Sequence, residues 1–354
     1  MRGFSALVGN PPWVSYAGKA AQPMAEPLRR YFLDRYESFA GFRNLQGMFV
    51  ERCAELLVPG GRMGIILPSS MSEQNGYAPT RLAHDKRCTC DDDLPDLGED
   101  GFLGVFQPSM VLRSTRLAND RTMSEAEPWP VERPDLDEGA RRLLAKMDRP
   151  ALPPHLFGER GLQSSGPDTH HLAAAPDAVH SVALRVGSDL EPFRRKLPSN
   201  YADPAWFRDR LREPAEWEAV RVLIRQTARV PMAALSDGVG FRNSILAGFE
   251  DDEHPAAFLV AYLNATPIRW LHYRRHRDAR QGLPQRKIGH LRATPAPPNT
   301  ALVKDLAALG RAWSERNAGL DVAEQADLDA RVATAFGLTE EERTRVHLWW
   351  EGLQ

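Results

Sequence analysis

The chain begins with two short apolar segments separated by a helix-like stretch, and this order constrains the fold more than any other feature. Phe4–Val8 is an apolar run of strand length that stops at Gly9-Asn10-Pro11-Pro12. Leu45–Leu57 has apolar residues at helical spacing, and Pro59-Gly60-Gly61 separates it from the apolar run Arg62–Leu67. Strand, helix and strand in this order predict a βαβ unit, and therefore a parallel sheet.

The rest of the chain predicts an α/β protein in several parts. We expect residues 1–150 to form the sheet domain, 151–200 an irregular linker rich in Pro, Gly, Ser and His, 201–298 an α+β domain, and 299–354 a helical segment. Further helices are expected at Leu28–Tyr36, Asp135–Met147, Ala256–Asn264, Pro267–Arg274, 300–318, 321–336 and 339–351, the last with a capping box at Thr339. Further strands are expected within Phe102–Leu117 and at Ala178–Val186, Val222–Gln226, Ser244–Phe249 and Lys287–Leu291.

Composition limits the setting in which the chain works. The net charge is -2, so any affinity for nucleic acid must come from a local patch. Three cysteines, Cys53, Cys88 and Cys90, are too few for a disulfide framework and suit the cytoplasm. No apolar run reaches the ~18 residues of a membrane-spanning helix, so we expect no membrane partner.

The tetrapeptide Asn10-Pro11-Pro12-Trp13 is the strongest candidate for chemistry. An exocyclic amine is a poor nucleophile because its lone pair is delocalised into the ring, and two acceptors at its hydrogens polarise it toward attack. The side-chain carbonyl of Asn10 and the backbone carbonyl of Pro11 can be those acceptors, since consecutive prolines restrict the backbone. Trp13 offers a flat surface on which an extruded base can stack. The alternative is a purely structural role, in which Asn-Pro-Pro forms the turn that ends a strand.

The segment Leu7-Val-Gly-Asn-Pro-Pro-Trp-Val14 resembles the catalytic motif of the adenine-N6 methyltransferases of restriction–modification systems. Phe49–Ser70 is similar to the helix, turn and strand that follow it in that family. Residues 225–249 and 257–298 resemble the target-recognition domain of enzymes that fuse methylase and specificity in one chain, TaqI-like in their C-terminal part. The resemblance implies a partial Rossmann-like methyltransferase sheet, S-adenosylmethionine as methyl donor, double-stranded DNA as substrate, and catalytic roles for Asn10, Pro11, Pro12 and Trp13.

The resemblance also has a gap. The family binds its donor with a glycine-rich turn and an acidic residue upstream of the catalytic motif, and only nine residues precede Asn10. Of the glycine clusters elsewhere, Ser236-Asp-Gly-Val-Gly240 comes closest to a donor site, but it does not lead from a strand into a helix. We therefore expect a second protein subunit to carry the donor-binding elements, and we assign no donor-binding residue.

A basic segment inside the near-neutral chain predicts the DNA contact. It interleaves aromatic residues and histidines with seven cations, Arg269, Arg274, Arg275, Arg277, Arg280, Arg286 and Lys287. The alternatives are a solvated helix face or a docking surface for an acidic partner. Two small clusters, Cys88-Thr-Cys90 and Asp168 with His170-His171, lack the spacing of a metal site, so we expect no metal.

Two other functions remain open at this point. The chain could be a non-enzymatic DNA-binding module of a defence complex, or an inactive gene remnant. Retained DNA binding without methylation under any partner condition would favour the first, and poor solubility from an uncovered apolar edge would favour the second.

Overall fold

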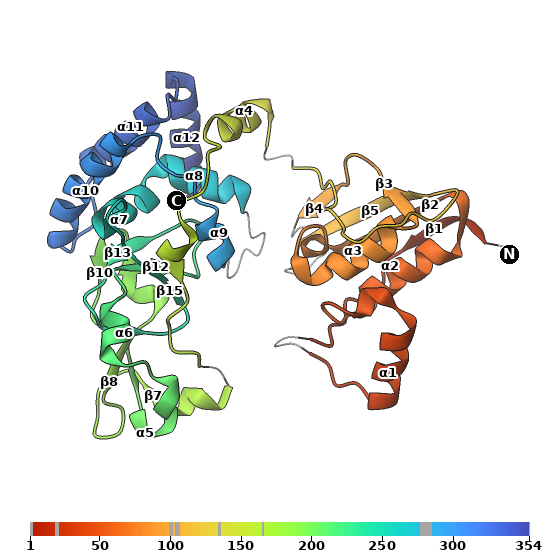
Figure 1. Ribbon diagram of the computed structural model, residues 1–354, viewed down its shortest axis with the longest axis horizontal. Helices are drawn as coiled ribbons and strands as arrows, with labels where there is room; N and C mark the ends of the chain where they lie inside the picture. The colour runs from red at the N-terminus through yellow and green to blue at the C-terminus, as the bar shows by residue number, and fades with distance from the viewer. Residues whose placement is uncertain are drawn as a thin grey trace. The chain divides into compact units, whose positions relative to one another are not determined.

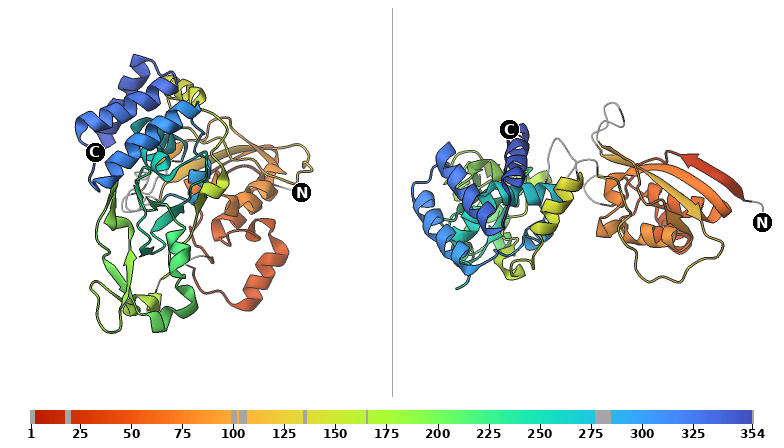
Figure 2. Two further views of the ribbon diagram at one scale, coloured as in Figure 1. Left: turned by 60° about the vertical axis from the view of Figure 1, so that its left-hand side comes forward. Right: turned by 90° about the horizontal axis from the view of Figure 1, so that it is seen from above.

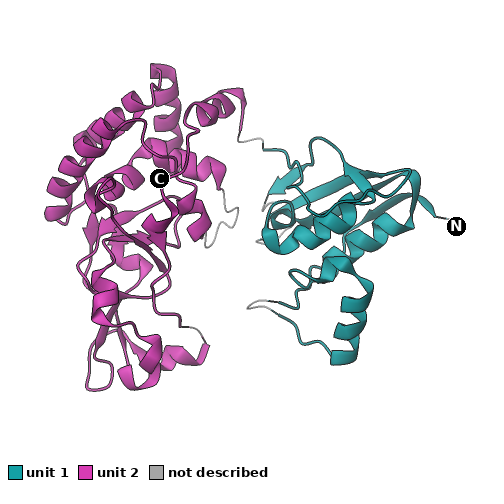
Figure 3. Cartoon of the chain, in the orientation of Figure 1, with its two compact units in different colours: residues 1–134, 279–282 teal, residues 135–278, 283–354 magenta. Residues whose placement is uncertain are grey.

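The computed structural model describes residues 3–17, 21–98, 102, 107–133, 136–164, 166–276 and 285–353. The chain forms two compact units, residues 1–134 with 279–282, and residues 135–278 with 283–354 (Figure 3). The boundary lies before the expected position at residue 150. The reason is helix α4 (Glu138–Lys146), whose Ala140 and Leu143 are buried in the core of the second unit.

The first unit is built on one sheet with the strand order β1-β2-β5-β3 (Figure 1). Strands β1 (Phe4–Gly9) and β2 (Leu57–Pro68) are parallel, and helix α2 (Leu45–Leu56) connects them, which confirms the predicted βαβ unit. Strand β5 (Ser109–Arg116) runs antiparallel to β2, and β3 (Cys88–Cys90) and β4 (Asp96–Gly98) pair antiparallel with β5. The sheet is therefore mixed, and the predicted parallel sheet is confirmed only for the β1–β2 pair. Two further helices belong to this unit, α1 (Glu26–Arg35) and α3 (Ala78–Asp85).

Alternation along β2 shows which face of the sheet is covered. Met63, Ile65 and Leu67 are buried, and they pack with Val50 and Ala54 of α2. The intervening side chains on β2 are half-buried or exposed. Among the described residues, the side chains on one face of the β1–β2 pair are therefore well buried, and those on the other face are only partly buried. Parallel sheets are normally buried on both faces.

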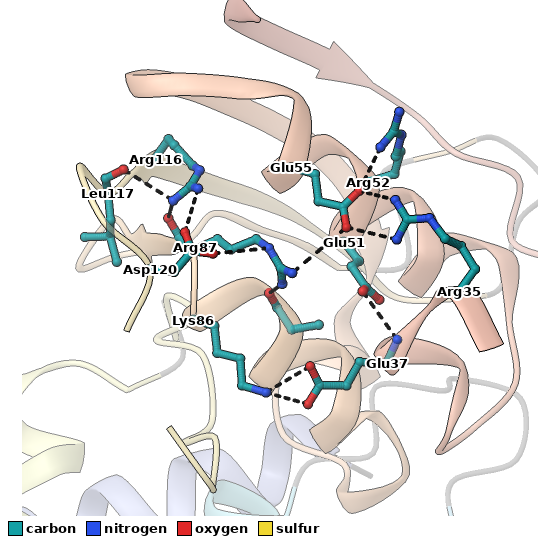
Figure 4. Close-up of polar contacts among 11 residues, drawn as sticks. Arg35, Glu37, Glu51, Arg52, Glu55, Lys86, Arg87, Arg116, Leu117 and Asp120 are labelled. Atoms are coloured by element: carbon teal, nitrogen blue, oxygen red, sulfur yellow. Dashed lines mark hydrogen bonds and ion pairs between the residues drawn. The ribbon is translucent and has the colours of Figure 1, made fainter. Parts of the chain in front are cut away.

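An ion-pair network joins the helices of the first unit around Glu55 (Figure 4). Arg35 of α1 donates to the Glu55 carboxylate at 2.6 Å, and Arg52 donates to it at 2.8 Å. Burial alone raises the pKa of Glu55, but these hydrogen bonds outweigh burial and hold the pKa below its ordinary value. Lys86, after α3, pairs with Glu37 at 2.6 Å. The pairs attach α1 and α3 to the body of the unit.

The second unit contains two small sheets. One is antiparallel with the order β13-β12-β15-β6, and the other is mixed with the order β14-β8-β11-β7. The strands are β6 (Phe157–Gly158), β7 (Leu172–Ala173), β8 (Val182–Arg185), β11 (Asn200–Ala202), β12 (Val222–Arg225), β13 (Ala233–Leu235), β14 (Gly240–Phe241) and β15 (Ile245–Gly248). A separate two-stranded ribbon pairs β9 (Leu190–Glu191) with β10 (Arg194–Arg195).

Helix α7 (Ala256–Asn264) lies at the centre of the second unit, and all nine of its residues are buried. Helix α10 (Thr300–Glu315) packs so closely on it that a Cβ at Gly310 would lie 2.2 Å from the backbone oxygen of Ala257. Short helices α5 (Pro204–Phe207) and α6 (Pro214–Glu218) accompany the mixed sheet, and the remaining helices are α8 (Thr266–Arg275), α9 (Ile288–Arg292), α11 (Val322–Ala335) and α12 (Glu340–Leu353). Helices α10, α11 and α12 gather on one side of the unit (Figure 2).

The predicted capping box opens α12, since the backbone N–H of Thr339 donates to Glu342 at 2.7 Å and the N–H of Glu342 donates to the Thr339 hydroxyl at 3.3 Å. In the described part of the chain, no helix is both long enough and apolar enough to cross a bilayer.

Two sequence predictions differ from the structure in this unit. The expected linker at 151–200 instead supplies β6 to β10 and the first residue of β11. Of these strands, β8 lies within the strand expected at Ala178–Val186, and the others are too short to show a period of two. The expected strand at Lys287–Leu291 is helix α9, because Ile288 and Leu291 are three residues apart and share a helix face, on which Leu291 is buried. The α/β fold class, followed by an α+β unit and C-terminal helices, is confirmed.

Candidate functional site

The four residues Asn10–Trp13 follow the carboxyl end of β1 directly. The register pairs Gly9 with Ile65, so the motif emerges beside the carboxyl end of β2. Ligands of open α/β sheets bind beyond the carboxyl ends of the strands. Asn10 and Pro12 are exposed, Pro11 is buried and Trp13 is half-buried. The sequence motif thus lies at the edge of the sheet where this fold places its chemistry.

The ring of Trp13 is held by two contacts. Its indole N–H donates a long hydrogen bond of 3.4 Å to the backbone oxygen of Ile66, near the end of β2. The ring of Phe102 lies edge-on to it, with centroids 5.9 Å apart and planes at 89°. Phe102 was not among the residues that the sequence predicted for the site around Trp13. Its only sequence signal is an aromatic residue between glycines after an acidic stretch.

The chain that follows the motif is fastened to the start of α2. The N–H of Leu45 donates to the Val14 oxygen at 3.0 Å, and the N–H of Tyr16 donates to the Arg43 oxygen at 2.8 Å. Asn44 caps the helix by accepting from the Gly47 N–H at 2.7 Å. The motif therefore has a fixed start at β1 and a fixed end at α2, which preorganises its carbonyls.

Hydrogen-bond acceptors dominate the chemistry that the motif offers. The amide oxygen of Asn10 and the backbone oxygen of Pro11 can each accept a hydrogen from one amine, and the rings of Trp13 and Phe102 add an apolar wall. None of these four groups titrates near neutral pH. The arrangement can therefore polarise and stack a planar amine without a charged general base.

Strand β1 is an edge strand with exposed apolar side chains. Val8 is 91% exposed and Phe4 is 54% exposed. On one side β1 pairs with β2, and on its other side no described strand pairs with it. Exposed apolar edges are templates for pairing with further strands. The free edge of β1 is therefore one place where this sheet can be extended.

The described helix starts of the first unit lack the glycine-rich turn of the donor sites expected for this fold. Its described helices start at proline-containing or Asn-capped turns, α1 at Glu26-Pro27, α2 after Asn44 and α3 at Ala78-Pro79. None of these starts is a glycine-rich turn directly after a strand, as a nucleotide-like ligand requires. In the second unit, Gly238 precedes the short strand β14 and Gly240 begins it, and the next element is strand β15, not a helix. Asp237 beside them is paired with Arg185 at 2.5 Å.

Two of the seven predicted DNA contacts are buried, which corrects the prediction for them. Arg269 is 2% exposed, and it donates to the Pro231 oxygen at 3.1 Å and to the Asn264 amide oxygen at 2.8 Å. Burial lowers the pKa of Arg269 to about 10, although Asp329 opposes this. Arg286 is 3% exposed and donates to the His272 oxygen at 3.3 Å. Both arginines serve the interior: Arg269 lies on the buried part of α8, and Arg286 lies in the segment just before α9.

The other predicted DNA contacts divide into three kinds. Arg274 and Arg275 are half-buried at the end of α8, and Arg275 pairs with Asp148 at 2.6 Å. Lys287 is exposed. Arg277 and Arg280 lie outside the described residues. DNA contact by these five residues stays a prediction.

The residues considered for metal binding have other partners. His84 is buried and hydrogen-bonds Asp85 at 2.6 Å and the Ser114 hydroxyl at 2.9 Å, although the ligand atoms of His84, Asp85 and Cys90 lie within 4.8 Å of one another. Burial raises the pKa of the Cys88 thiol to about 12. Asp168 accepts from Trp206 at 3.0 Å and from Arg210 at 3.0 Å. These contacts are those of structural polar groups.

The first quarter of the chain matches a known protein family. Residues 1–88 match the family model described as Eco57I restriction-modification methylase. This match confirms the resemblance to restriction–modification methyltransferases, for the segment that contains Asn10–Trp13, α2 and β2. No curated protein matches the sequence.

Several solved structures show low similarity to this chain. The restriction-modification enzyme MmeI in complex with DNA has 12% identity and a TM-score of 0.49, with 97% of this chain and 57% of that chain covered. The M protein of the type I restriction enzyme EcoKI has 18% identity and a TM-score of 0.23, with 37% and 24% covered. A protein from Listeria monocytogenes described as a class I S-adenosylmethionine-dependent methyltransferase has 14% identity and a TM-score of 0.28, with 41% and 42% covered. The present chain therefore spans less than two thirds of each of these structures.

Proposed function

We propose that this chain takes part in the methylation of the N6 amine of adenine in double-stranded DNA, as part of a restriction–modification or phage-defence system in the cytoplasm. One observation carries the proposal: Asn10–Trp13 follows the carboxyl end of β1, beside the end of β2, within the segment that matches the methylase family. The first unit would supply the residues that activate the amine. The second unit would supply DNA recognition.

The proposed roles follow from the atoms that the motif presents. Asn10 and Pro11 accept hydrogen bonds from the two amine hydrogens, which returns electron density to the nitrogen. Trp13 and Phe102 supply aromatic surface for an adenine flipped out of the duplex, and their edge-to-face contact keeps that surface rigid. Catalysis then rests on positioning rather than on proton transfer.

The donor, S-adenosylmethionine, is proposed to bind to polypeptide outside these 354 residues. Two observations support this proposal. The described helix starts of the first unit have no glycine-rich turn after a strand, and β1 leaves a free apolar edge at Val8 and Phe4. A donor-binding segment that adds strands to this edge would bury both side chains and bring the donor next to Asn10. That segment is proposed to belong to a second subunit.

Calorimetry with S-adenosylmethionine tests the division of labour. The chain is titrated alone and together with the polypeptide encoded immediately upstream. We expect binding only in the second case. Tight binding by the chain alone would contradict the division, because it would require a donor site within these residues.

A substitution at Asn10 tests the chemistry in the reconstituted complex. We expect Asn10→Ala to lower the methylation rate by about 10²- to 10³-fold, since removal of one preorganised hydrogen-bonding group has this effect in other enzymes. DNA affinity should stay the same. The matched control is Asn119→Ala, which removes an exposed amide elsewhere on the first unit and should leave the rate unchanged. An unchanged methylation rate in Asn10→Ala would contradict the proposed role of Asn10.

A further inference from the structure

Polar side chains from three separate segments meet on the second unit. Gln163 comes from the segment after Gly161, Asn200 begins β11, and Arg242 and Asn243 directly follow β14. The backbone fixes two of these segments side by side. The N–H of Leu162 donates to the Phe241 oxygen at 2.8 Å, and the N–H of Asn243 donates to the Leu162 oxygen at 3.1 Å.

Gly161 allows this close approach. A Cβ at this position would lie 2.5 Å from both the carbonyl carbon and the oxygen of Arg242, which is nearer than real Cβ atoms come. Any other residue would push the two segments apart. The cluster is thus held by backbone contacts, and its side chains do not depend on a mobile loop for their positions.

Arg242 is a half-buried cation whose hydrogen bonds go to neutral groups. Its Nε donates to the Ser164 hydroxyl at 2.9 Å, and its Nη1 donates to the Asn200 amide oxygen at 2.7 Å. Arg185 of β8, the strand that pairs with β14, instead forms two hydrogen bonds with the Asp237 carboxylate, at 2.5 and 2.9 Å. Burial lowers the pKa of Arg242, with Asp168 opposing. A partly desolvated guanidinium that has no hydrogen bond to a carboxylate gains most from an acceptor supplied by a ligand.

Gln163 and Asn243 form an amide pair next to Arg242. The Asn243 side-chain N–H donates to the Gln163 amide oxygen at 3.0 Å. Within the described part of the chain, this pair leaves the Gln163 amide nitrogen and the Asn243 amide oxygen without hydrogen-bond partners. Exchange of oxygen and nitrogen in both amides would still leave one donor and one acceptor. Gln163 is exposed and Asn243 is half-buried, so solvent or a ligand can reach the pair.

The free groups match the edges of purine bases. In the major groove adenine presents the N7 acceptor and the N6 donor, and guanine presents the N7 and O6 acceptors. One donor and one acceptor on the amide pair are complementary to adenine. The Nη2 hydrogens of Arg242, which lack a partner in the described residues, are complementary to guanine. Arg160, exposed three residues before Gln163, adds a cation for the DNA backbone.

We infer that Gln163, Asn243 and Arg242 form a base-reading cluster that selects a target sequence containing adenine and guanine. This inference rests on the proposed function, since it assigns the DNA recognition of the second unit to particular side chains. The amide pair reads an adenine. Arg242 reads a guanine and holds Asn200 and Ser164 in place around it.

Selection from random duplexes tests the cluster, with the full chain as the bait and sequencing of the bound DNA as the readout. We expect the native chain to enrich a motif with adenine and guanine. Gln163→Ala should lower the preference for one adenine by roughly 10- to 100-fold while other positions of the motif persist. Asn243→Asp should change that position toward cytosine, whose N4 donor suits a carboxylate. Asn119→Ala serves as the control and should enrich the native motif.

The outcomes separate the inference from the proposed function. If the native chain enriches a motif that neither Gln163→Ala nor Asn243→Asp alters, the cluster is structural and the inference is wrong. If the native chain shows no sequence preference, the proposed DNA recognition itself fails, and the inference fails with it. Thermal unfolding of each variant checks the fold, and these exposed or half-buried positions should leave the midpoint near that of the native chain.

Discussion

The two units differ in how far they bury their own elements. In the second unit, α7 is buried along its whole length, and the polar groups at its end are hydrogen-bonded. In the first unit, β1 leaves Val8 91% exposed at a free sheet edge. The second unit therefore buries its central helix by itself, whereas the first unit leaves an apolar edge strand to which another segment could pair.

Both units contain a buried arginine. The second unit buries Arg269 and holds it with Asn264 and a backbone oxygen. The first unit buries Arg81, which donates to backbone oxygens, and it also joins its helices through exposed or half-buried ion pairs around Glu55. Buried polar groups have large energetic consequences when a partner is removed, and surface pairs have small ones. Four substitutions test this contrast.

The largest effect is expected at Asn264. Its amide accepts from the Ala233 N–H at 3.1 Å and donates to the Ala233 oxygen at 2.7 Å, and it also accepts from Arg269. Asn264→Ala should lower the free energy of unfolding of the second unit by about 3–5 kcal/mol, because it leaves buried groups and a buried cation without a partner. Denaturant unfolding followed by hydrogen exchange would locate the loss. A decrease below about 1 kcal/mol would show that this interior is tolerant.

The next effect is expected at Gly310. A Cβ there would lie 2.2 Å from the Ala257 oxygen, so Gly310→Ala should separate α10 from α7 and cost about 1–3 kcal/mol. Gly289→Ala is the matched control, since a Cβ at this helical glycine meets nothing within 4 Å. Alanine favours helix over glycine, so the control should be neutral or slightly stabilising. Thermal unfolding of the two variants would rank them, and equal midpoints would contradict the close packing.

A smaller, pH-dependent effect is expected at Glu55 in the first unit. The pKa of Glu55 is lowered from 4.5 in the folded state, so its stabilisation is present above that pH and is lost as the pH falls through the folded pKa. Glu55→Gln should cost about 1 kcal/mol at neutral pH and very little at strongly acidic pH. Unfolding by denaturant at a series of pH values measures this. A difference between variant and native chain that does not change with pH would exclude the charge as its cause.

The smallest effect on the isolated chain is expected at the free edge. Val8 is 91% exposed, so Val8→Lys should change the free energy of unfolding by no more than about 0.5 kcal/mol. The same substitution should weaken capture of a donor-binding segment, because a charge would face the added strand. A binding measurement with the upstream polypeptide separates the two effects. Unchanged capture would show that the edge is not the site of extension.

The sequence predicted the first unit better than the second, and the reasons are physical. In the first unit, the βαβ unit and the site of Asn10–Trp13 after β1 carry periodic apolar patterns or specific turns. The long helices of the second unit carry apolar periodicity as well. Strands of two or three residues such as β6 and β7 are too short to show a period of two, so residues 151–200 looked irregular. Phe102 reaches Trp13 through the tertiary fold, and no local pattern reports such a contact.

The predicted basic segment shows a different limit. A count of cationic residues treats Arg269 and Lys287 alike, but Arg269 is 2% exposed and Lys287 is exposed. Burial depends on which face of α8 meets the strands and helices around it, and these partners are far away in the sequence. Composition therefore located a basic region but did not separate structural cations from surface ones.

The backbone contact at Gly161 has a consequence for how such a protein can diversify. The hydrogen bonds between residues 162 and 241–243 are made by main-chain atoms, and Gly161 makes room for them whatever side chains follow. Exchanges at Gln163 and Asn243 would thus leave the framework intact. A lineage that faces changing selection could explore new specificities by single codon changes on an unchanging scaffold, without passing through unstable ancestors.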